Sequence, residues 1–304
     1  MKINFAGCAR DCADVLVANI SALLAIGDMP WCDELRIYVV ENSSVDNTRD
    51  IILHLADHDP RIIPVLLEDL DEVMPTREAR IAFCRDRLLD EICKNQSDGL
   101  YVPIDLDSNI AFSLDADAFL KACQLVASGQ CSGAFPSSTP YYYDIYALRK
   151  ADWCPGNCWE EINDSNTRGA LLNLLATIRY VSLRQKRYEK LLCEGLIPIN
   201  SAFGGVGIYT LASIHQSGAR YSSPLLEVVN KKLCEHVIFN AFFCDLFIIP
   251  DWIITAPPEH IKFRSLSYYR ICLRLVQAGI EDLNRLPFVI SSLFKRHIIK
   301  CIGD

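Results

Sequence analysis

The sequence predicts an α/β fold with a mostly parallel central sheet flanked by helices. From Lys2 to Ala127, short β-rich runs alternate with longer amphipathic runs, and short polar turns join them, which is the pattern of successive β-α units. The chain has 304 residues, of which 51% are hydrophobic, so it can bury a sizeable core. We therefore expect one α/β domain over residues 1–260 and a helical tail over residues 261–304.

Each predicted element has its own signal. Strands are short apolar runs between turn residues, and helices are amphipathic runs that follow a capping residue. Asp11 or Asp14 can cap the first helix and Thr76 the third. The aromatic run 141–149 is expected to form a strand at the sheet edge or across a cleft, and the polar stretch 151–169 an active-site loop or small insertion. In chain order, the other predicted strands are 3–7, 34–41, 61–68 and 101–104, and the predicted helices are 15–26, 49–56, 77–93 and 115–127.

Composition excludes several classes of protein. The formal net charge of −8 argues against a general nucleic-acid binder, which needs a basic surface. The 14 cysteines are scattered singly through apolar segments, as buried small hydrophobes are, and predict no disulfide framework. Cys154 and Cys158 in "CPGNC" are either half of a zinc site or the ends of a Pro-Gly turn. We recognise no signal peptide and no membrane span, so a cytoplasmic setting is expected.

The tail differs from the rest of the chain in charge. Residues 261–304 carry a net charge of +5, which leaves −13 elsewhere, and they also contain large apolar residues, as in "FVISSLFKRHIIK". Such a pattern favours helices packed on the core, and it also fits a basic amphipathic helix on an anionic membrane surface. Peripheral membrane contact is therefore one of two expected uses of this tail.

The segment "YVPIDLDSN" ends an apolar strand in two carboxylates, Asp105 and Asp107. In open α/β sheets, ligands bind at the carboxyl ends of the strands. Two nearby carboxylates repel one another unless a cation or a proton comes between them. The pair predicts either a divalent metal site or a solvated turn, because Asp, Ser and Asn also favour turns.

Two further side chains are expected at the same edge of the sheet. Glu41 ends the second predicted strand, where it can accept hydrogen bonds from a ribose or a base. Arg10 follows the first strand, where its guanidinium can bind a diphosphate bidentately or form a structural ion pair.

Several segments together resemble a known family. In order, "YVVENSSVDNTRDII", "RIAFCRDRLL" and "YVPIDLDSN" are similar to the GT-A glycosyltransferases of the family-2 type, which have an acidic strand end, an Arg-Asn helix and a DxD motif. Further along, "YYYDIYALR", "SAFGGVGIY" and "CEHVIFN" are similar to a subgroup with fungal capsule-type mannosyltransferases and related bacterial and viral sugar transferases. The chain departs from the family at Asp86, where Asn is usual.

The resemblance implies a GT-A fold, which is Rossmann-like, and transfer of a sugar from a nucleotide-sugar to an acceptor hydroxyl. Asp107 would bind Mn²⁺ or Mg²⁺ together with the donor diphosphate, and Asp105 would contact the ribose or a metal-bound water. Hard cations and carboxylates suit one another, and a cation stabilises the charge of the leaving diphosphate. Carried over by position, Glu41 would read the nucleoside, and Arg10 and Arg85 would lie near the nucleotide.

Other site residues are assigned by the same resemblance and by their chemistry. Glu235 in "CEHVIFN" would face the acceptor, as the base of an inverting transfer or as a positioning group in a retaining one. Asp144 within the tyrosine run could complete a sugar or acceptor platform, or it could end a strand. His260 is expected as a third metal ligand, with His236 as its rival.

Gly204 and Gly205 would let the backbone approach donor or acceptor, and they would otherwise form an ordinary turn. They lack the strand-then-helix setting of a dinucleotide fingerprint, so NAD binding is rejected.

The predicted function is a metal-dependent hexosyltransferase that uses a GDP- or UDP-sugar, with mannose from GDP-mannose as the first expectation, and a glycan or lipid-linked acceptor. A nucleotidyltransferase also places metal-binding acids at a strand end, but "GCARDC" lacks the glycine-rich basic loop it would need. A catalytically inactive sugar-binding or scaffold protein is the third alternative, in which the acids are turn residues.

Overall fold

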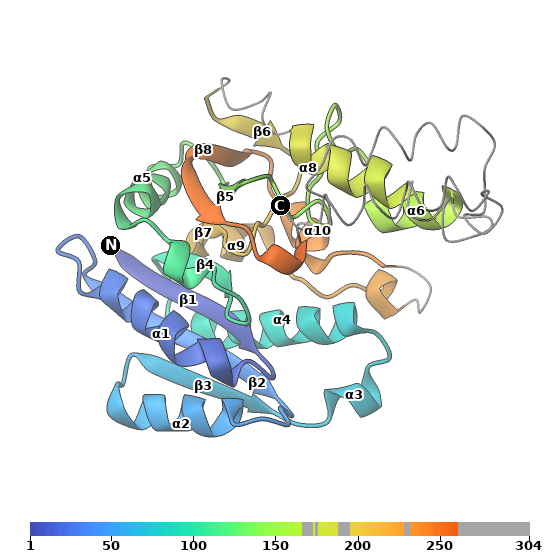
Figure 1. Cartoon of the computed structure of the whole chain (residues 1–304). Coiled ribbons are helices and arrows are strands. Elements are labelled where there is room, and N and C mark those ends of the chain that lie inside the picture. Colours follow the sequence, from blue (N-terminus) through green and yellow to red (C-terminus); the bar gives the residue numbers. More distant parts are fainter. Residues whose placement is uncertain (166–172, 174–175, 188–194, 228–231, 261–304) are drawn as a thin grey trace, which may run out of the picture.

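The computed structural model describes residues 1–165, 173, 176–187, 195–227 and 232–260 (Figure 1). The predicted tail, residues 261–304, lies outside these described residues, as do residues 166–172, 174–175, 188–194 and 228–231. The strands are β1 (Lys2–Ala9), β2 (Glu34–Asn42), β3 (Ile62–Leu67), β4 (Leu100–Asp105), β5 (Gly133–Thr139), β6 (Ile197–Ile199), β7 (Ile208–Thr210) and β8 (Leu246–Thr255). The α-helices are α1 (Ala13–Gly27), α2 (Thr48–His58), α3 (Leu70–Val73), α4 (Arg77–Asn95), α5 (Ala116–Ala127), α6 (Cys158–Ser165), α8 (Leu183–Arg187), α9 (Leu211–Ser217) and α10 (Glu235–Asn240).

The strands form one mixed sheet in the order β3-β2-β1-β4-β7-β5-β8-β6. β3, β2, β1 and β4 are mutually parallel, β5 is parallel to β8, and β7 and β6 run antiparallel to their neighbours. The predicted α/β class with a mostly parallel sheet is therefore confirmed. β1 lies between β2 and β4, so the strand order reverses there, and the carboxyl ends of these strands form a ligand-binding crevice in sheets of this kind.

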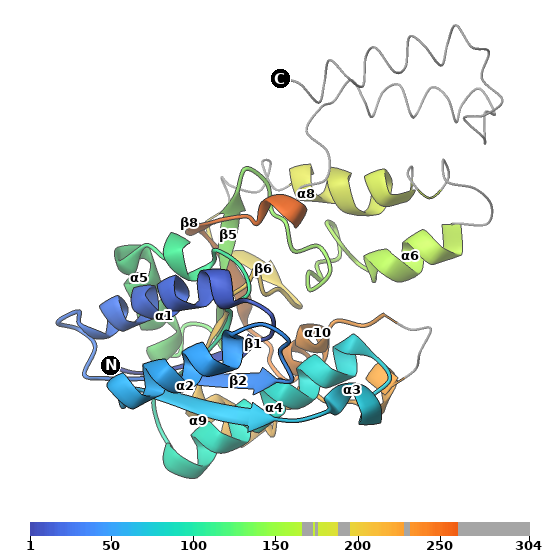
Figure 2. The same ribbon diagram turned by 60° about the horizontal axis from the view of Figure 1, so that its bottom comes forward.

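Both faces of the sheet are covered by helices. Along β2, Ile37 and Val39 belong to the core beneath α1, α2 and α5, whereas Tyr38 and Val40 belong to the core beneath α4. Alternate side chains of a strand point to opposite faces, so each strand contributes to both cores. The two views show α6 and α8 beside each other at one end of the molecule (Figures 1 and 2), where Arg184 forms an ion pair with Glu161.

Some local predictions are confirmed and others are wrong. Thr76 caps α4 by accepting a hydrogen bond from the Ala79 backbone N–H at 3.2 Å. Neither Asp11 nor Asp14 caps α1, which begins after Cys12 without a side-chain cap. Its first backbone donors bind the next loop instead, since the Ala13 N–H donates to Asp46 at 3.0 Å. A neighbouring loop can thus replace a local cap.

The aromatic run 141–149 is not the expected strand, because the strand is β5 (133–139) and the run that follows is a turn-rich loop. Side chains satisfy its backbone donors: Ser138 Oγ accepts from the Tyr143 N–H, and Asp144 Oδ1 accepts from the Ala147 N–H. Such bonds compete with a sheet ladder. The polar stretch that follows contains α6, and Cys154 and Cys158 are free, buried thiols. No described helix is long and apolar enough to cross a membrane.

Candidate active site

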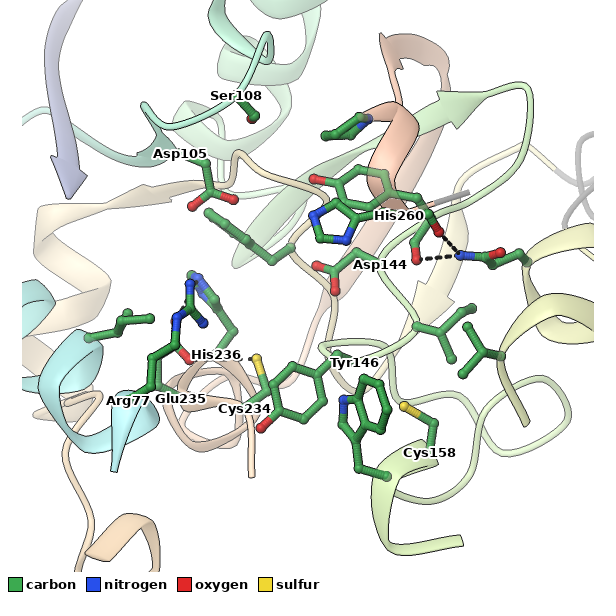
Figure 3. Close-up of a pocket in the computed structure, with 18 of the residues that line it drawn as sticks. Arg77, Asp105, Ser108, Asp144, Tyr146, Cys158, Cys234, Glu235, His236 and His260 are labelled. Atoms are coloured by element: carbon green, nitrogen blue, oxygen red, sulfur yellow. Dashed lines mark hydrogen bonds and ion pairs between the residues drawn. The ribbon is translucent and has the colours of Figure 1, made fainter. Parts of the chain in front are cut away.

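Two adjoining cavities open at the carboxyl ends of the strands. The first, of about 330 Å³, is lined by residues at the ends of β1 and β2, including Arg10 and Asn42, and by the first turns of α4. We call it the strand-end cavity. The second, of about 310 Å³, is lined by aromatic residues and by Asp144 and Glu235; we call it the aromatic cavity (Figure 3). Arg77, Ile81, Arg85, Asp105 and Asp107 line both.

The two cavities differ in charge. Beyond the residues they share, the strand-end cavity adds Arg10, Arg80 and Asp11, whereas the aromatic cavity adds the carboxylates Asp144 and Glu235. The strand-end cavity therefore suits an anionic group better than the aromatic cavity does. Asp105 and Asp107 line both cavities and so lie where the two meet.

Asp105 is the last residue of β4, and its backbone N–H donates to the Gly205 carbonyl at 2.8 Å. Its carboxylate accepts a hydrogen bond from Arg85 Nη2 at 3.0 Å. Burial raises the pKa of Asp105 to about 7, with the neighbouring charges of Asp107, Asp144 and Glu235 in the same direction and Arg85 opposing them. The side chain is 33% exposed, so solvent in the cavities screens part of this effect.

Arg85 is the cation beneath the two cavities. Its side chain is only 4% exposed, and it bridges two elements, since Nη2 binds Asp105 on β4 and Nε binds Glu235 on α10 at 3.1 Å. The guanidinium also lies 4.9 Å from the centre of the Phe203 ring. Arg85 thus lines the predicted nucleotide region with two nitrogens bound to protein carboxylates, while its buried Nη1 has no hydrogen-bond partner among the described residues.

The unusual Asp86 beside it has a structural use. Its carboxylate accepts hydrogen bonds from the backbone N–H groups of Tyr221 and Ser222 at 2.8 and 3.0 Å. A carboxylate is suited to accept two backbone bonds, whereas an amide offers one oxygen and two donors. Asp86 therefore holds the loop after α9 against α4.

Glu235 and Asp144 both line the aromatic cavity (Figure 3). Glu235 is 6% exposed and begins α10. Asp144 binds two backbone N–H groups, that of Ala147 through Oδ1 at 3.1 Å and that of Gly204 through Oδ2 at 2.9 Å. Burial raises the pKa of Asp144, and these two bonds oppose that rise. Asp144 therefore ties the aromatic loop to the glycine turn.

Glu41 is not presented to a ligand, contrary to expectation. Its side chain is fully buried, and its two oxygens accept from the Ser44 N–H and from Arg49 Nε. Of the two expectations for Arg10, the structure shows the structural ion pair: its Nη1 and Nη2 donate to Asp71 at 3.0 and 2.6 Å. The partners of Glu41 come from the loop and helix that directly follow it, whereas Arg10 is paired with Asp71, 61 residues away in the chain.

Gly204 and Gly205 form a turn beside the two aspartates, with φ values of +66° and +82°. Residues that carry a side chain rarely adopt this left-handed backbone conformation. At Gly205, a Cβ atom would lie 2.7 Å from Ile110 Cγ1 and 2.8 Å from the Tyr143 hydroxyl. Glycine at position 205 therefore lets the backbone pack closely against Ile110 and Tyr143 while its carbonyl binds the Asp105 N–H.

The two histidines differ in environment. His260 is exposed, lines the aromatic cavity, and stacks on Tyr143 with ring centres 5.4 Å apart. His236 is 2% exposed and stacks on Phe203 at 3.6 Å, and neither ring nitrogen has a hydrogen-bond partner. Burial and the nearby Arg85 charge lower the pKa of His236 well below its usual value, so the ring is neutral.

The residues present can hold a divalent cation only in part. Within the described ranges, no group of three His, Cys, Asp or Glu side chains could ligate one ion together, so His260 does not complete a site with Asp105 and Asp107. Magnesium, however, is usually held by one or two carboxylates plus substrate phosphates. The exposed Asp107 and the partly exposed Asp105 fit that arrangement, in which the nucleotide supplies the remaining ligands.

Sequence reasoning missed three cavity residues. Arg77 and Arg80 line the strand-end cavity, and Trp159 lines the aromatic cavity. The available signal was the spacing in "TREARIAFCR", which puts Arg77, Ile81 and Arg85 on one face of a helix. For Trp159 no signal existed, because its helix lies in a stretch that reads as a polar loop.

The strand ends also hold unusual backbone. Asp11 after β1 and Ser43 after β2 have φ values of +50° and +48°, a left-handed region that costs a non-glycine residue about 1–2 kcal/mol. The two loops are bound to each other, since the Asp11 N–H donates to Ser44 Oγ and the Val45 N–H donates to Asp11 Oδ1. Strained backbone residues cluster at functional sites, which is consistent with a ligand at the strand-end cavity.

Comparison with known proteins shows structural likeness only. No protein-family model and no curated protein sequence matches the chain. It is similar to the solved structures of S. aureus TarS 1-349 (13% identity, TM-score 0.47) and of the mannosyltransferase PcManGT from Pyrobaculum calidifontis in complex with GDP-Man and Mn²⁺ (12%, 0.49). A third is M. tuberculosis glucosyl-3-phosphoglycerate synthase, with 14% identity and a TM-score of 0.41.

These matches cover 86%, 89% and 93% of this chain, respectively, and 62%, 60% and 82% of the solved chains. The chain thus spans about six tenths of the length of TarS 1-349 and of PcManGT. The likeness concerns the arrangement of the chain alone.

Proposed function

We propose that this protein is a metal-dependent GT-A glycosyltransferase that moves a hexose from a nucleotide-sugar to an acceptor hydroxyl. The first candidate donor is GDP-mannose, from which mannose would be transferred. One observation carries the proposal: two cavities of different charge meet at Asp105 and Asp107. In a nucleotide-sugar, the nucleoside carries an anionic diphosphate, and a neutral sugar is attached to the far end of that diphosphate. The charge difference supports placing the nucleotide in the strand-end cavity and the sugar with its acceptor in the aromatic cavity.

Asp107 and Asp105 would hold Mn²⁺ or Mg²⁺ together with the donor phosphates. When bound, such an ion would stabilise the negative charge that develops on the leaving diphosphate. The Gly205 carbonyl binds the Asp105 backbone N–H, and Arg85 binds its carboxylate, which orients that carboxylate at the junction of the two cavities.

Glu235 is the better of the two proposed catalytic carboxylates. One of its oxygens, Oε1, binds Arg85, whereas Oε2 has only the weak Cys234 thiol 3.8 Å away. Oε2 can therefore accept the proton of an acceptor hydroxyl in the aromatic cavity. Asp144 uses both oxygens for backbone N–H groups, which favours a positioning role for it. Tyr146 and Trp159 offer apolar faces that suit sugar rings.

Calorimetry with purified protein tests the donor site. UDP- and GDP-sugars are titrated with Mn²⁺ and again with EDTA, alongside the Asp107→Ala variant. We expect one nucleotide class to bind with Mn²⁺, to bind more weakly with EDTA, and to lose its Mn²⁺ dependence in Asp107→Ala. Turnover by that variant at the wild-type rate would exclude the metal mechanism.

A second candidate is a sugar-binding protein without catalysis. It is favoured by one observation, that the described side chains provide no complete three-ligand metal site. Under this alternative, a neutral sugar would bind in the aromatic cavity with the same affinity in Mn²⁺ and in EDTA, and no donor would be consumed.

The proposed membrane contact depends on residues 261–304, outside the described part of the chain. It remains a prediction from the +5 charge of that tail. Sedimentation with anionic vesicles, with and without the tail, tests it: equal binding by both proteins would leave the tail without a membrane role.

A further inference from the structure

The outer wall of the strand-end cavity is rich in arginine. Arg10 follows β1, and Arg77 and Arg80 lie in the first turn of α4, and all three line this cavity. The side chains of Arg10 and Arg80 are 40% and 22% exposed, so both remain accessible to a ligand in the cavity.

One carboxylate orients two of these arginines. Asp71 on α3 accepts two bonds from Arg10, at 3.0 and 2.6 Å, and its Oδ1 lies 2.7 Å from Arg80 Nε. Arg80 is also held by the Met74 carbonyl, which accepts from its Nη1 at 2.8 Å. Asp11, the other acid near Arg10, lies 3.7 Å from its Nε. Asp71 thus fixes two cations side by side while neutralising one.

Arg77 has no such partner. Among the described residues, no hydrogen bond or ion pair is formed by its guanidinium, and it is exposed. It lines both cavities and therefore lies near their junction, on the same helical face as Arg85. A guanidinium presents several donors in a planar fork that matches the oxygens of a phosphate.

We propose that Arg77, Arg80 and Arg10 form an arginine wall that binds the phosphate chain of a nucleotide, with Asp71 as the positioning residue. Arg77 contacts the phosphate next to the sugar, because it borders the aromatic cavity, and Arg10 and Arg80 contact the phosphate on the nucleoside side. The identity of the ligand rests on the proposed function. The anion site itself rests only on the three arginines and their shared acid.

The wall has a chemical consequence for transfer. When the bond between the sugar and the diphosphate breaks, its electron pair stays on the phosphate oxygen, and the diphosphate gains one negative charge. Cations held beside that oxygen stabilise the product more than the intact donor. Arg77 should therefore affect the rate of transfer as well as the affinity for the donor.

Inorganic pyrophosphate is the first probe, because it tests the wall without assuming a base or a sugar. Binding to the full chain is measured by calorimetry in EDTA, and then with GDP and UDP in Mn²⁺. We expect Arg77→Gln and Arg80→Gln to weaken each interaction about 10- to 100-fold, the range for a lost hydrogen bond to a charged group. Arg77→Lys, which keeps the charge but not the fork, should recover part of the affinity.

Asp71→Asn distinguishes orientation from general charge. The substitution removes a negative charge, so a merely diffuse positive field would bind pyrophosphate more tightly afterwards. A positioning role predicts weaker binding, because Arg10 and Arg80 lose their common partner. Tighter binding in Asp71→Asn would overturn the positioning role of this residue.

Arg87→Gln is the matched control, since Arg87 lies on the same helix and lines neither cavity; it should bind pyrophosphate as the wild type does. If wild-type protein binds neither pyrophosphate nor a nucleoside diphosphate, or if Arg77→Gln and Arg80→Gln bind both normally, the arginine wall is wrong. Sugar transfer by the wild type would then still support the proposed function. Conversely, arginine-dependent pyrophosphate binding without any transfer would support the wall and contradict the transferase.

Discussion

Replacing Arg85 tests how the site is held together. Arg85→Met removes the charge from a side chain that is 4% exposed, and it leaves Asp105 and Glu235 without the guanidinium that lies 3.0 and 3.1 Å from them. Loss of one partner of a buried ion pair costs about 3–5 kcal/mol. Most of this cost should come from Glu235, whose side chain is 8% exposed, because Asp105 is 33% exposed and reaches solvent in the cavities.

The free energy of unfolding is measured by urea denaturation at pH 8, with Arg87→Met on the same helix as the control. We expect Arg85→Met to lose about 3–5 kcal/mol and Arg87→Met to change by less than about 0.5 kcal/mol. Adding Glu235→Gln to Arg85→Met should recover more stability than adding Asp105→Asn does. Equal stability of the two arginine variants, or greater recovery with Asp105→Asn, would refute this account of the charge cluster.

Three further predictions follow from single residues. Gly205→Ala should destabilise the protein by about 2–4 kcal/mol in thermal melts, because the left-handed backbone and the overpacking each contribute. The control is Gly129→Ala, which has φ of +74° and no atom within 4 Å of the new Cβ; it should show only the backbone cost. His236 has a lowered pKa, so the unfolded chain binds the proton that the folded chain resists, and stability should fall as pH drops below about 6.5, by at most about 1.4 kcal/mol per pH unit. His236→Phe should remove that part of the slope in urea titrations between pH 5 and pH 8, and an unchanged slope would contradict a buried neutral ring. Asp107→Asn should change the unfolding free energy by less than about 0.5 kcal/mol because the side chain is exposed, yet abolish any Mn²⁺ dependence of GDP or UDP binding.

The strands illustrate how far local pattern reaches. The first four predicted strands coincide with β1 to β4 within a few residues, because each is a short apolar run whose alternate side chains enter two cores. The edge-strand prediction for 141–149 failed, because β-rich composition does not reveal that Ser138 and Asp144 satisfy the local backbone donors. Propensity describes the preference of a segment, whereas its hydrogen-bond partners depend on its neighbours.

The site residues divide in the same way. Asp105 and Asp107 were predictable, since a strand end is a local feature and β4 adjoins the point where strand order reverses. The burial of Glu41 was not, because Arg49 and the Ser44 N–H reach it only once the loop after β2 has folded back. Arg10 likewise meets Asp71 from a segment 61 residues away.

The α/β class, the strand ends and the polar residues at the sheet edge could be predicted from the sequence, because these depend on periodicity and on short-range turn chemistry. Which of those residues are free depends on the tertiary contacts. The fold engaged Arg10 and Arg85 with carboxylates, buried Glu41, left Arg77 unpaired among the described residues, and joined two cavities at Asp105 and Asp107. A charged side chain forms an ion pair with an opposite charge that the fold brings within a few ångströms of it, and the two residues can be far apart in the sequence.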